Sequence, residues 1–500
     1  MTADVRDSMS VSRVRALRIL GGAAVATALS PSVSRAASAE VTPILGCPTD
    51  RSATLHVHAD RAVDVFVERL GSNSGTNRQT PTRVARPEAP AVFSIDDLDR
   101  GVRYGYQVWV RAEGSGDDFA PGTQGAIQTA RRPDEAFTFT VQGDSHPERQ
   151  GKQFDPTLYA RTLDAIGADH PDFHLMLGDD FSVDALKVVN AMSVNGRYTL
   201  QIPFLGRIAH SVPLYLVNGN HEQAARYLLD GTPNNVAVWA QVSRNRAFPQ
   251  PAPDHFYTGN HEVVPHIGLL RNYFAWTWGD ALFVTLDPYW GSDVAVDNVF
   301  QGTSKRADLW DSTLGETQYR WFREVLGASR ARWKFVFAHH VNGTGRGGAA
   351  IADRYEWGGR NARGVWEFDR RRPGWRLPIH QLMAAHGVTV FFQGHDHLYA
   401  HEQLDGVIYQ TVPEPADPNS MLWNDDAYPG AVIHSNSGYL RVHVAPNAIH
   451  VEYVKSYLAQ DALANRPDGT PRVHGEVAHD YVVTATTASP SASLPRHGAA

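Results

Sequence analysis

Five short motifs carrying histidine, carboxylate or amide side chains occur in this 500-residue chain, each where a run of β-favouring apolar residues ends. In four of them a glycine comes first, and glycine lets the backbone turn sharply off a strand and approach a bound group closely. The motifs are Gly143-Asp144-Ser145-His146, Gly178-Asp179, Gly219-Asn220-His221-Glu222, His339 and Gly394-His395-Asp396-His397. Side chains of these types gathered at strand ends predict a site for two metal ions.

Such a site must offset the repulsion between its ions. Two divalent cations about 3.5–4 Å apart need a carboxylate that bridges them and several neutral nitrogen or oxygen ligands. The candidate ligands are Asp144, His146, Asp179, Asn220, His339, His395 and His397. Imidazole suits zinc and iron, whereas carboxylate and amide oxygens also admit manganese, magnesium or calcium. The predicted cofactors are therefore two divalent or transition metal ions, with the choice among these metals left open.

The order of the motifs resembles that of the calcineurin-like metallophosphoesterase superfamily, over residues 135–457. Each motif alone is a weak signal, but five in order, each at a predicted strand end, are specific. The residues that the resemblance implies for the first ion are Asp144, His146 and His397. Those implied for the second ion are Asn220, His339 and His395. Asp179 would bridge the two ions, and His221 would not be a ligand.

The resemblance implies hydrolysis of a phosphoric ester by metal-bound hydroxide. A bound divalent ion lowers the pKa of water from about 15.7 towards about 7, so no protein nucleophile is needed. His221 is expected to contact the phosphate and to protonate the leaving oxygen as a catalytic acid. In related enzymes an aspartate orients this histidine. Here Ser182 is the first position to examine, with Asp180 and Asp184 as alternatives.

Residues next to the motifs carry more ordinary interpretations. Adjacent strand residues point to opposite faces, so only one of His339 and His340 should face the metals, and the family pattern favours His339. Glu222 is expected to hydrogen-bond locally at its turn, and Asp180 to be a solvated loop charge. No role is assigned to the isolated histidines His170, His210 and His255.

Composition limits the class of protein. The chain is too long for one ordinary domain, and its 42% hydrophobic and 10% aromatic content is ample for large cores. A net charge of −7 argues against specific nucleic-acid binding. No apolar run is long enough to form a transmembrane segment. Cys47 is the single cysteine, so no internal disulfide is possible.

The chain divides into four predicted parts. They are a signal peptide at 1–39, a fibronectin type III-like β-sandwich at 41–131, a metallophosphoesterase domain at 135–457 and a C-terminal extension at 458–500, disordered at its end. Within 41–131, short period-two strands alternate with turn residues, as in a β-sandwich. Residues 98–106 resemble the corner before a late strand of fibronectin type III modules.

The first 39 residues have the pattern of an export signal. Arg13, Arg15 and Arg18 precede a weakly apolar run at 19–29, and residues 37–39 form an Ala-Ser-Ala cleavage pattern. The arginine-containing start resembles a twin-arginine signal, although Val14 separates the first two arginines. An exported protein is predicted, whether periplasmic, cell-surface or secreted. A disordered tail on a cytoplasmic protein is the alternative.

Within the catalytic part, apolar strand runs alternate with helical stretches, which predicts a layered α/β fold with ligands at the carboxyl ends of the strands. The helical stretches are 157–166, 317–326 and 378–386. Residues 273–287, broken at Gly279-Asp280, predict a β-hairpin. The resemblance implies in addition a β-sandwich of two facing mixed sheets flanked by helices.

Purple acid phosphatases, a subgroup of the superfamily, also pair a fibronectin-like module with the catalytic fold. Their iron-binding tyrosine lies three residues after the bridging aspartate, where this chain has Ser182. Their first motif has a glycine where this chain has His146. The resemblance therefore implies a metal centre without a tyrosine ligand and without its charge-transfer colour.

Substrate selection is expected to come from loops rather than from the metals. Residues 341–375 contain seven arginines against four Asp or Glu residues, a local charge of 7 − 4 = +3. This segment could attract a phosphorylated substrate, or its arginines could pair with its own acids.

The function predicted from the sequence is hydrolysis of a phosphorylated small molecule or a phosphodiester. The alternative from another class is a non-catalytic surface-binding protein with a structural metal site, against which the intact ligands and His221 argue. A third possibility is an enzyme of this fold that acts on a different ester. The natural substrate and the oligomeric state stay open.

Overall fold

The computed structural model describes residues 39–71, 77–295, 308–343, 345–420, 422, 424–461 and 470–485. The predicted signal peptide, except Ala39, and the end of the C-terminal extension lie outside these residues. None of the described helices has the length and apolar character that a membrane span requires.

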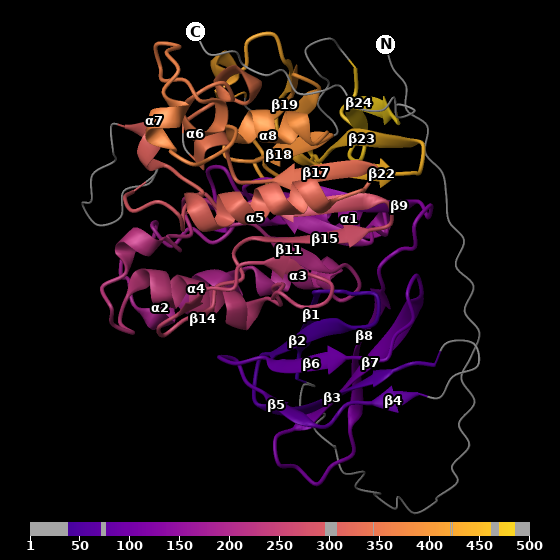
Figure 1. Cartoon of the computed structure of the whole chain (residues 1–500). Coiled ribbons are helices and arrows are strands. Elements are labelled where there is room, and N and C mark those ends of the chain that lie inside the picture. The colour runs from indigo at the N-terminus through magenta and orange to yellow at the C-terminus, as the bar shows by residue number, and fades with distance from the viewer. Residues whose placement is uncertain are drawn as a thin grey trace, which may run out of the picture. The chain divides into compact units, whose positions relative to one another are not determined.

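Residues 41–128 form a small all-β sandwich of two sheets (Figure 1). The first sheet contains β1 (Val41–Gly46), β2 (Ala53–Ala59) and β6 (Ala91–Ile95), in that order. The second sheet contains β4 (Arg78–Gln79), β3 (Val63–Arg69), β7 (Arg103–Ala112) and β8 (Ala120–Gln128), with β5 (Arg83–Ala85) also paired to β3. Alternating apolar residues such as Leu55, Val65 and Val108 are buried between the sheets.

Tyr104, at the start of β7, folds back onto the preceding corner. The Asp99 N–H donates to the Tyr104 hydroxyl oxygen at 2.9 Å, and that hydroxyl donates to Asp99 Oδ2 at 3.0 Å. A tyrosine hydrogen-bonded to backbone a few residues upstream is a feature of immunoglobulin-like sandwiches. The corner predicted from residues 98–106 is therefore present.

The first sheet of the catalytic part combines a parallel half with an antiparallel half. Its order is β11 (Leu214–Leu216), β10 (Phe173–Met176), β9 (Phe137–Gln142), β22 (Gly438–Val444), β23 (Ala448–Lys455) and β24 (Val477–Thr484). β9, β10 and β11 run parallel, and β22 joins β9 antiparallel. β24 lies beyond residue 457, the predicted end of the catalytic domain, yet it pairs with β23 in this sheet.

The second sheet faces the first. Its order is β12 (Thr258–Gly259), β15 (Phe274–Trp278), β16 (Ala281–Thr285), β17 (Trp333–Phe337), β18 (Val390–Gln393), β20 (Val407–Thr411), β19 (Tyr399–Leu404) and β21 (Val432–His434). β15 and β16 form the predicted hairpin, and β16, β17 and β18 run parallel. A separate small hairpin joins β13 (Val263–Val264) to β14 (Gly268–Leu269).

Aromatic side chains fill the space between the two sheets. Phe139 of the first sheet makes edge-to-face contacts with Phe283 and Phe335 of the second, with ring centroids 5.2 Å apart in both pairs. Such pairs stabilise a core beyond the apolar area they bury. This dry interior holds the two sets of strand ends in fixed positions.

Helices cover the outer faces of both sheets (Figure 1). Those packed on the first sheet are α1 (Pro156–Ala168), α2 (Ala191–Leu200), α3 (Ile202–Ala209) and α4 (Val236–Ala247). Those packed on the second are α5 (Gly315–Ala328), α6 (Tyr355–Gly358), α7 (Phe368–Arg371) and α8 (Ile379–Ala385). The short 3-10 helices are η1 (Pro147–Arg149), η2 (Arg226–Leu228), η3 (Leu309–Asp311), η4 (Val341–Gly343), η5 (Ala349–Ile351) and η6 (Asp425–Ala427). The predicted layered α/β fold, a β-sandwich flanked by helices and preceded by a small all-β sandwich, is confirmed.

Candidate metal centre

The predicted motifs lie at the carboxyl ends of strands from both facing sheets. β9, β10 and β11 are followed by Asp144, Asp179 and Asn220, and β17 and β18 by His339 and His395. The two sets meet, because Asp144 Oδ1 accepts the backbone N–H of His395 at 2.7 Å. Residues 251 positions apart in the sequence thus share one hydrogen bond.

Two of the motif glycines are required by this close approach. A Cβ atom on Gly219 would lie 2.2 Å from Asp179 Oδ1, and one on Gly394 would lie 2.4 Å from Asp144 Oδ1. Both positions therefore exclude any side chain, which explains why glycine precedes these motifs.

Three ligand atoms converge at one point of the site. Asn220 Oδ1 lies 2.8 Å from His339 Nε2 and 3.0 Å from His395 Nδ1, and the two imidazole nitrogens are 3.1 Å apart. Ligand atoms at right angles on one ion, each about 2.1 Å from it, would be about 3.0 Å apart. The spacing fits ligands of a single metal ion.

The other ring nitrogens of these two histidines fix which nitrogen carries the proton. His339 Nδ1 lies 2.8 Å from the carbonyl oxygen of Leu177, and His395 Nε2 lies 3.0 Å from that of Gly345. A carbonyl oxygen only accepts, so each of these nitrogens donates. In the neutral rings His339 Nε2 and His395 Nδ1 then carry lone pairs, and both face Asn220 Oδ1. Two lone pairs and a carbonyl oxygen repel one another unless a cation lies between them.

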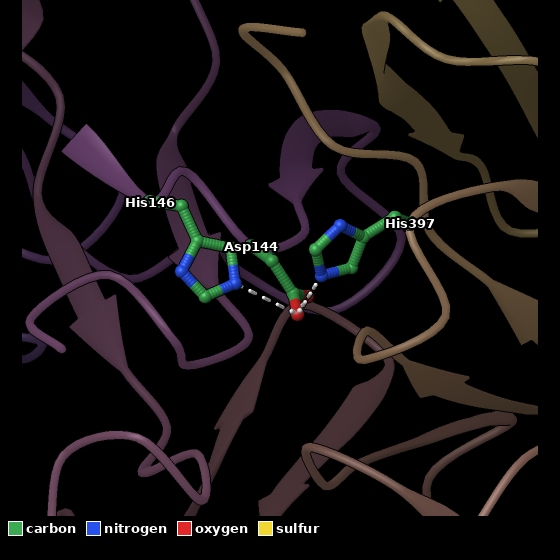
Figure 2. A group of neighbouring side chains, drawn as sticks. All are labelled: Asp144, His146 and His397. Atoms are coloured by element: carbon green, nitrogen blue, oxygen red, sulfur yellow. Dashed lines mark ion pairs between the residues drawn. The ribbon is translucent and has the colours of Figure 1, made fainter. Parts of the chain in front are cut away.

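A second group of ligand atoms surrounds Asp144 (Figure 2). His397 Nε2 lies 3.3 Å and His146 Nε2 lies 3.9 Å from Asp144 Oδ2. Asp144 Oδ2 and His146 Nε2 are buried and make no hydrogen bond within the described part of the chain. Unsatisfied buried polar atoms are rare in proteins and call for a partner such as an ion.

Carboxylates hold the outer nitrogens of these two histidines. His146 Nδ1 lies 2.9 Å from Glu148 Oε1, and His397 Nδ1 lies 3.0 Å from Glu414 Oε2. In the neutral ring of His146 the Nδ1 proton therefore points to Glu148 and the Nε2 lone pair faces Asp144, whereas Glu414 is an ion-pair partner of His397. A carboxylate behind a histidine is a common outer partner of metal-binding imidazoles.

Asp179 lies between the two groups. Its Oδ2 atom is 3.1 Å from His339 Nε2 and 3.7 Å from His221 Nε2, while its Oδ1 accepts the backbone N–H of His221 at 2.8 Å. Asp179 can join a metal-binding group either with His339 and His395 or with His146 and His221. This is the place that a bridging carboxylate would occupy.

The carboxylates make the site strongly negative. Burial opposes the charged form of His339, but Asp179 and Asp144 outweigh it and raise the pKa of His339 to about 10. Burial likewise opposes the charge on His397, and Glu414 and Asp144 raise its pKa to about 10. The same field attracts a metal cation, which would displace these protons. The donor set and its field therefore fit the two metal ions that the family implies.

His221 is adjacent to Asn220 but is held differently. Its Nδ1 lies 2.9 Å from Asp184 Oδ1, which directs Nε2 towards Asp179. Burial tends to lower the pKa of His221, but the neighbouring carboxylates Asp179 and Asp184 raise it. Asp184 is thus the residue that orients this histidine. Ser182, the first position considered, instead contacts His146 Nδ1 at 3.1 Å.

The expectation for Asp180 was wrong. Asp180 is fully buried, and its Oδ1 accepts hydrogen bonds from Ser145 Oγ at 2.6 Å and Gln142 Nε2 at 3.3 Å. Burial raises its pKa well above the usual value. A charge that looks solvated in the sequence is enclosed because the loop after β10 runs beneath the helices, where Gln201 at the start of α3 donates to the Asp180 carbonyl oxygen at 2.9 Å.

Glu222 acts at its own turn, as expected. Its carboxylate accepts the backbone N–H groups of Gly219, Asp179, Asp180 and Phe181. It thereby ties the loop after β11 to the loop after β10. Among the described residues His340 belongs to no metal-binding group; its Nε2 lies 3.6 Å from Asp396 Oδ2, and its ring packs on that of His395, with centroids 4.7 Å apart.

The arginines of residues 341–375 mostly contact acids of the same segment. Arg372 pairs with Glu356 at 2.5 Å, and Arg370 pairs with Glu367 at 3.0 Å. Arg346 reaches the loop that carries the candidate ligands His395 and His397, where its Nη1 donates to His395 O and Asp396 Oδ1, both at 2.9 Å. These pairs favour the interpretation in which the arginines of this segment pair with its own acids over the one in which they attract a phosphorylated substrate.

The family model described as calcineurin-like phosphoesterase matches residues 137–399. Human tartrate-resistant acid phosphatase type 5 is 25% identical over 240 residues, which cover 48% of this chain and 58% of that protein. The mouse protein of the same name is 22% identical over 323 residues, 62% of this chain and 82% of that one. The chain thus spans little more than half the length of the human relative.

Two solved structures share the fold of this chain. Purple acid phosphatase PPD1 from yellow lupin seeds has a TM-score of 0.59 at 15% identity, covering 92% of this chain and 78% of that one. PhoD has a TM-score of 0.60 at 14% identity, covering 89% of this chain and 90% of that one. At such identities the similarity shows the fold alone.

Proposed function

The chain belongs to the calcineurin-like phosphoesterase family, and from this premise we propose that it hydrolyses phosphoric esters at a dinuclear metal centre. The observation that carries the proposal is the set of four histidines whose outer nitrogens are held by carbonyl or carboxylate oxygens. Their inner lone pairs converge on Asp144, Asp179 and Asn220. A merely structural histidine cluster has no need of such alignment.

Each ion would have its own ligands. The first would be held by Asp144, His146 and His397, and the second by Asn220, His339 and His395. Asp179 would touch both. When bound, the ions would acidify a water molecule and stabilise the charge that develops on the phosphoryl oxygens.

His221 would act as the acid for the leaving group. Asp184 holds the proton on Nδ1, so the proton to be donated is on Nε2, which faces the ligand cluster. As hydroxide, formed from water by loss of a proton to solvent, bonds to phosphorus, the ester P–O bond breaks, and the proton on Nε2 passes to the departing alkoxide. Catalysis of this kind contributes typically about 10²–10⁴-fold to the rate.

The test is the variant His221→Ala, with His255→Ala as a surface control because His255 is more than half exposed. His221→Ala should retain both metals and lose about 10²–10⁴-fold in kcat on an alkyl phosphate. It should lose much less on an activated aryl phosphate, whose leaving group needs no proton. Metal analysis and activity towards both esters are measured on the same sample. Full alkyl phosphatase activity in the metal-loaded variant would remove His221 from the mechanism.

Export belongs to the same proposal. Residues 37–39 form the small-residue pattern of a cleavage site, and the domains would be the sandwich at 41–131 and the catalytic part from 135. N-terminal sequencing of protein recovered outside the cytoplasm should begin after Ala39. An intact N-terminus on all of the protein would contradict export by this signal.

A further inference from the structure

Arg149 ends η1, three residues after the candidate ligand His146. Its Nη2 atom lies 3.3 Å from His221 Nε2, and its Nη1 donates to Gln153 Oε1 at 2.7 Å. Among the described residues, its ion pair is from Nε to Glu148 Oε1, at 3.5 Å. The guanidinium is therefore held from behind, while Nη2 points at the nitrogen assigned to proton donation.

Arg149 differs in this respect from Arg346, which also reaches the metal loops. Arg346 places Nη1 2.9 Å from Asp396 Oδ1 and the same distance from the carbonyl oxygen of His395. Its charge is matched by the chain. Arg149 Nη2, by contrast, contacts the imidazole of His221, which offers no negative charge.

Arg149 Nη2 and His221 Nε2 lie 3.3 Å apart, so one oxygen placed beside them can be within hydrogen-bond distance of both. Guanidinium forks match the oxygens of phosphate better than any other side chain. The pair therefore fits a phosphoryl oxygen.

We infer that Arg149 is a substrate-binding residue that holds a non-bridging phosphoryl oxygen and favours phosphomonoesters over phosphodiesters. The inference rests on the proposed function. A monoester carries three non-bridging oxygens and a charge close to −2, whereas a diester carries two such oxygens and a charge of −1. The additional oxygen and charge of the monoester are what Arg149 would recognise.

Glu148 explains how the arginine is aligned with the metal ligands. The same Oε1 atom lies 2.9 Å from His146 Nδ1 and 3.5 Å from Arg149 Nε. One carboxylate thus orients a candidate ligand and the candidate substrate-binding group. Because Gln153 holds the opposite side of the guanidinium, lysine could not reproduce this arrangement.

The experiment compares two esters that have the same aryl leaving group, an aryl phosphate and the corresponding methyl aryl phosphate. For Arg149→Ala, kcat/KM should fall roughly 10–100-fold on the monoester and less than about 3-fold on the diester. On the monoester, kcat/KM of Arg149→Lys should lie between the values for Arg149→Ala and the wild type. The matched control is Arg207→Ala, since Arg207 of α3 forms an exposed pair with Asp164 of α1 and contacts no candidate ligand in the described part of the chain. Metal content is measured for every variant.

A second measurement does not depend on turnover. Calorimetry of inorganic phosphate binding to the metal-loaded protein should give a dissociation constant raised about 10–100-fold in Arg149→Ala. Equal losses of kcat/KM on both esters would overturn the inference, because Arg149 would then act through His221. A wild-type enzyme with a higher kcat/KM on the diester than on the monoester would also overturn it. If the wild type hydrolyses neither ester, the proposed function fails. In that case the binding of inorganic phosphate alone tests the role of Arg149. A dissociation constant for phosphate that is the same in Arg149→Ala and the wild type overturns that role.

Discussion

Two histidine clusters join residues from both facing sheets, and only one of the two has the features of a metal site. At the metal centre, the ring centroids of His339 and His395 are 5.0 Å apart, as are those of His146 and His397. At the sheet edge, His479 of β24 lies 5.8 Å from both His401 of β19 and His434 of β21, again between ring centroids. Counting histidines, or measuring how closely their rings approach, hardly separates the two.

The difference lies in what holds each ring. At the sheet edge, His479 Nδ1 contacts the Tyr399 hydroxyl at 2.7 Å, while the described residues offer no hydrogen bond to the rings of His401 or His434. Their neighbours are the rings of tyrosines, such as Tyr481 at 4.3 Å from His401. At the metal centre, each ring has an oxygen behind it and a carboxylate or amide in front. Orientation, rather than proximity, makes the site.

A third pair of histidines shows that anchoring alone is not sufficient. His56 and His58 of β2 donate to the carbonyl oxygens of Arg246 and Ala247, at 2.9 and 2.8 Å. These bonds join the small sandwich to the end of α4. The described part of the chain places no metal-binding group around either ring. A metal site in this molecule therefore needs both the anchors and a converging set of ligand atoms.

The largest effect is expected from removing the carboxylate on which both groups converge. Asp179→Ala should lose both ions and essentially all activity, whereas His146→Ala should lose one ligand and retain part of the metal. The reason is that Asp179 groups with His339 and His395 on one side and with His146 on the other and would touch both ions, while His146 would give one nitrogen to the first ion. Metal content per chain after gel filtration measures the difference. Equal metal retention by the two variants would contradict the bridging role.

The gathering of the candidate ligands was predictable because these residues follow strands directly. In a motif such as Gly394 to His397, the sequence indicates both where the strand ends and which side chains offer donor atoms. The outer partners were not predictable, since they depend on which loops meet in space. Glu414 follows β20 and reaches His397 from a different strand, and Leu177 and Gly345 contribute only their backbone oxygens. Backbone carbonyls carry no sequence signal at all.

The wrong expectation for Asp180 and the choice left open for the partner of His221 have the same origin. Ser182, Asp180 and Asp184 lie within five positions, and spacing alone could not show which one reaches His221. The structure assigns Asp184 to His221, Ser182 to His146, and Asp180 to a buried network with Ser145. The loop after β10 turns at Asp179, with φ of 58°, so successive side chains point in directions that strand periodicity does not give.

A smaller effect is expected from the outer partners. Glu414→Gln keeps the shape of the side chain but removes the negative charge behind His397, so metal affinity or activity should fall about 10–100-fold. Glu324→Gln, on the exposed face of α5, is the control. Metal dissociation constants are measured by competition with a chelator. Affinity unchanged from the wild type would show that the alignment of His397 does not need Glu414.

Acid should lower the stability of the fold through protonation of His56 and His58, the pair anchored to backbone carbonyl oxygens outside the candidate metal centre. Burial is the main cause that lowers the pKa of His56 and of His58 to about 4, against an ordinary value near 6.5. Between those values the unfolded chain binds more protons, so stability is complete above about pH 6.5 and decreases towards pH 4. Each histidine contributes a slope of at most about 1.4 kcal/mol per pH unit. Between pH 7 and pH 4.5, the free energy of unfolding measured in urea should fall less for His58→Gln than for the wild type. An equal fall in the two proteins would contradict this assignment.

The smallest effect is expected at the sheet edge, and it tests the comparison directly. His479→Ala removes the contact with Tyr399 and should cost about 1 kcal/mol of stability, the usual value for one hydrogen bond. It should change neither the metal content nor the activity, because no outer oxygens align the lone pairs of His401 and His434. Metal analysis of wild type and variant, both loaded with excess zinc and then desalted, measures this. A third ion per chain in the wild type that is absent from His479→Ala would show that histidines can bind a metal here without anchors.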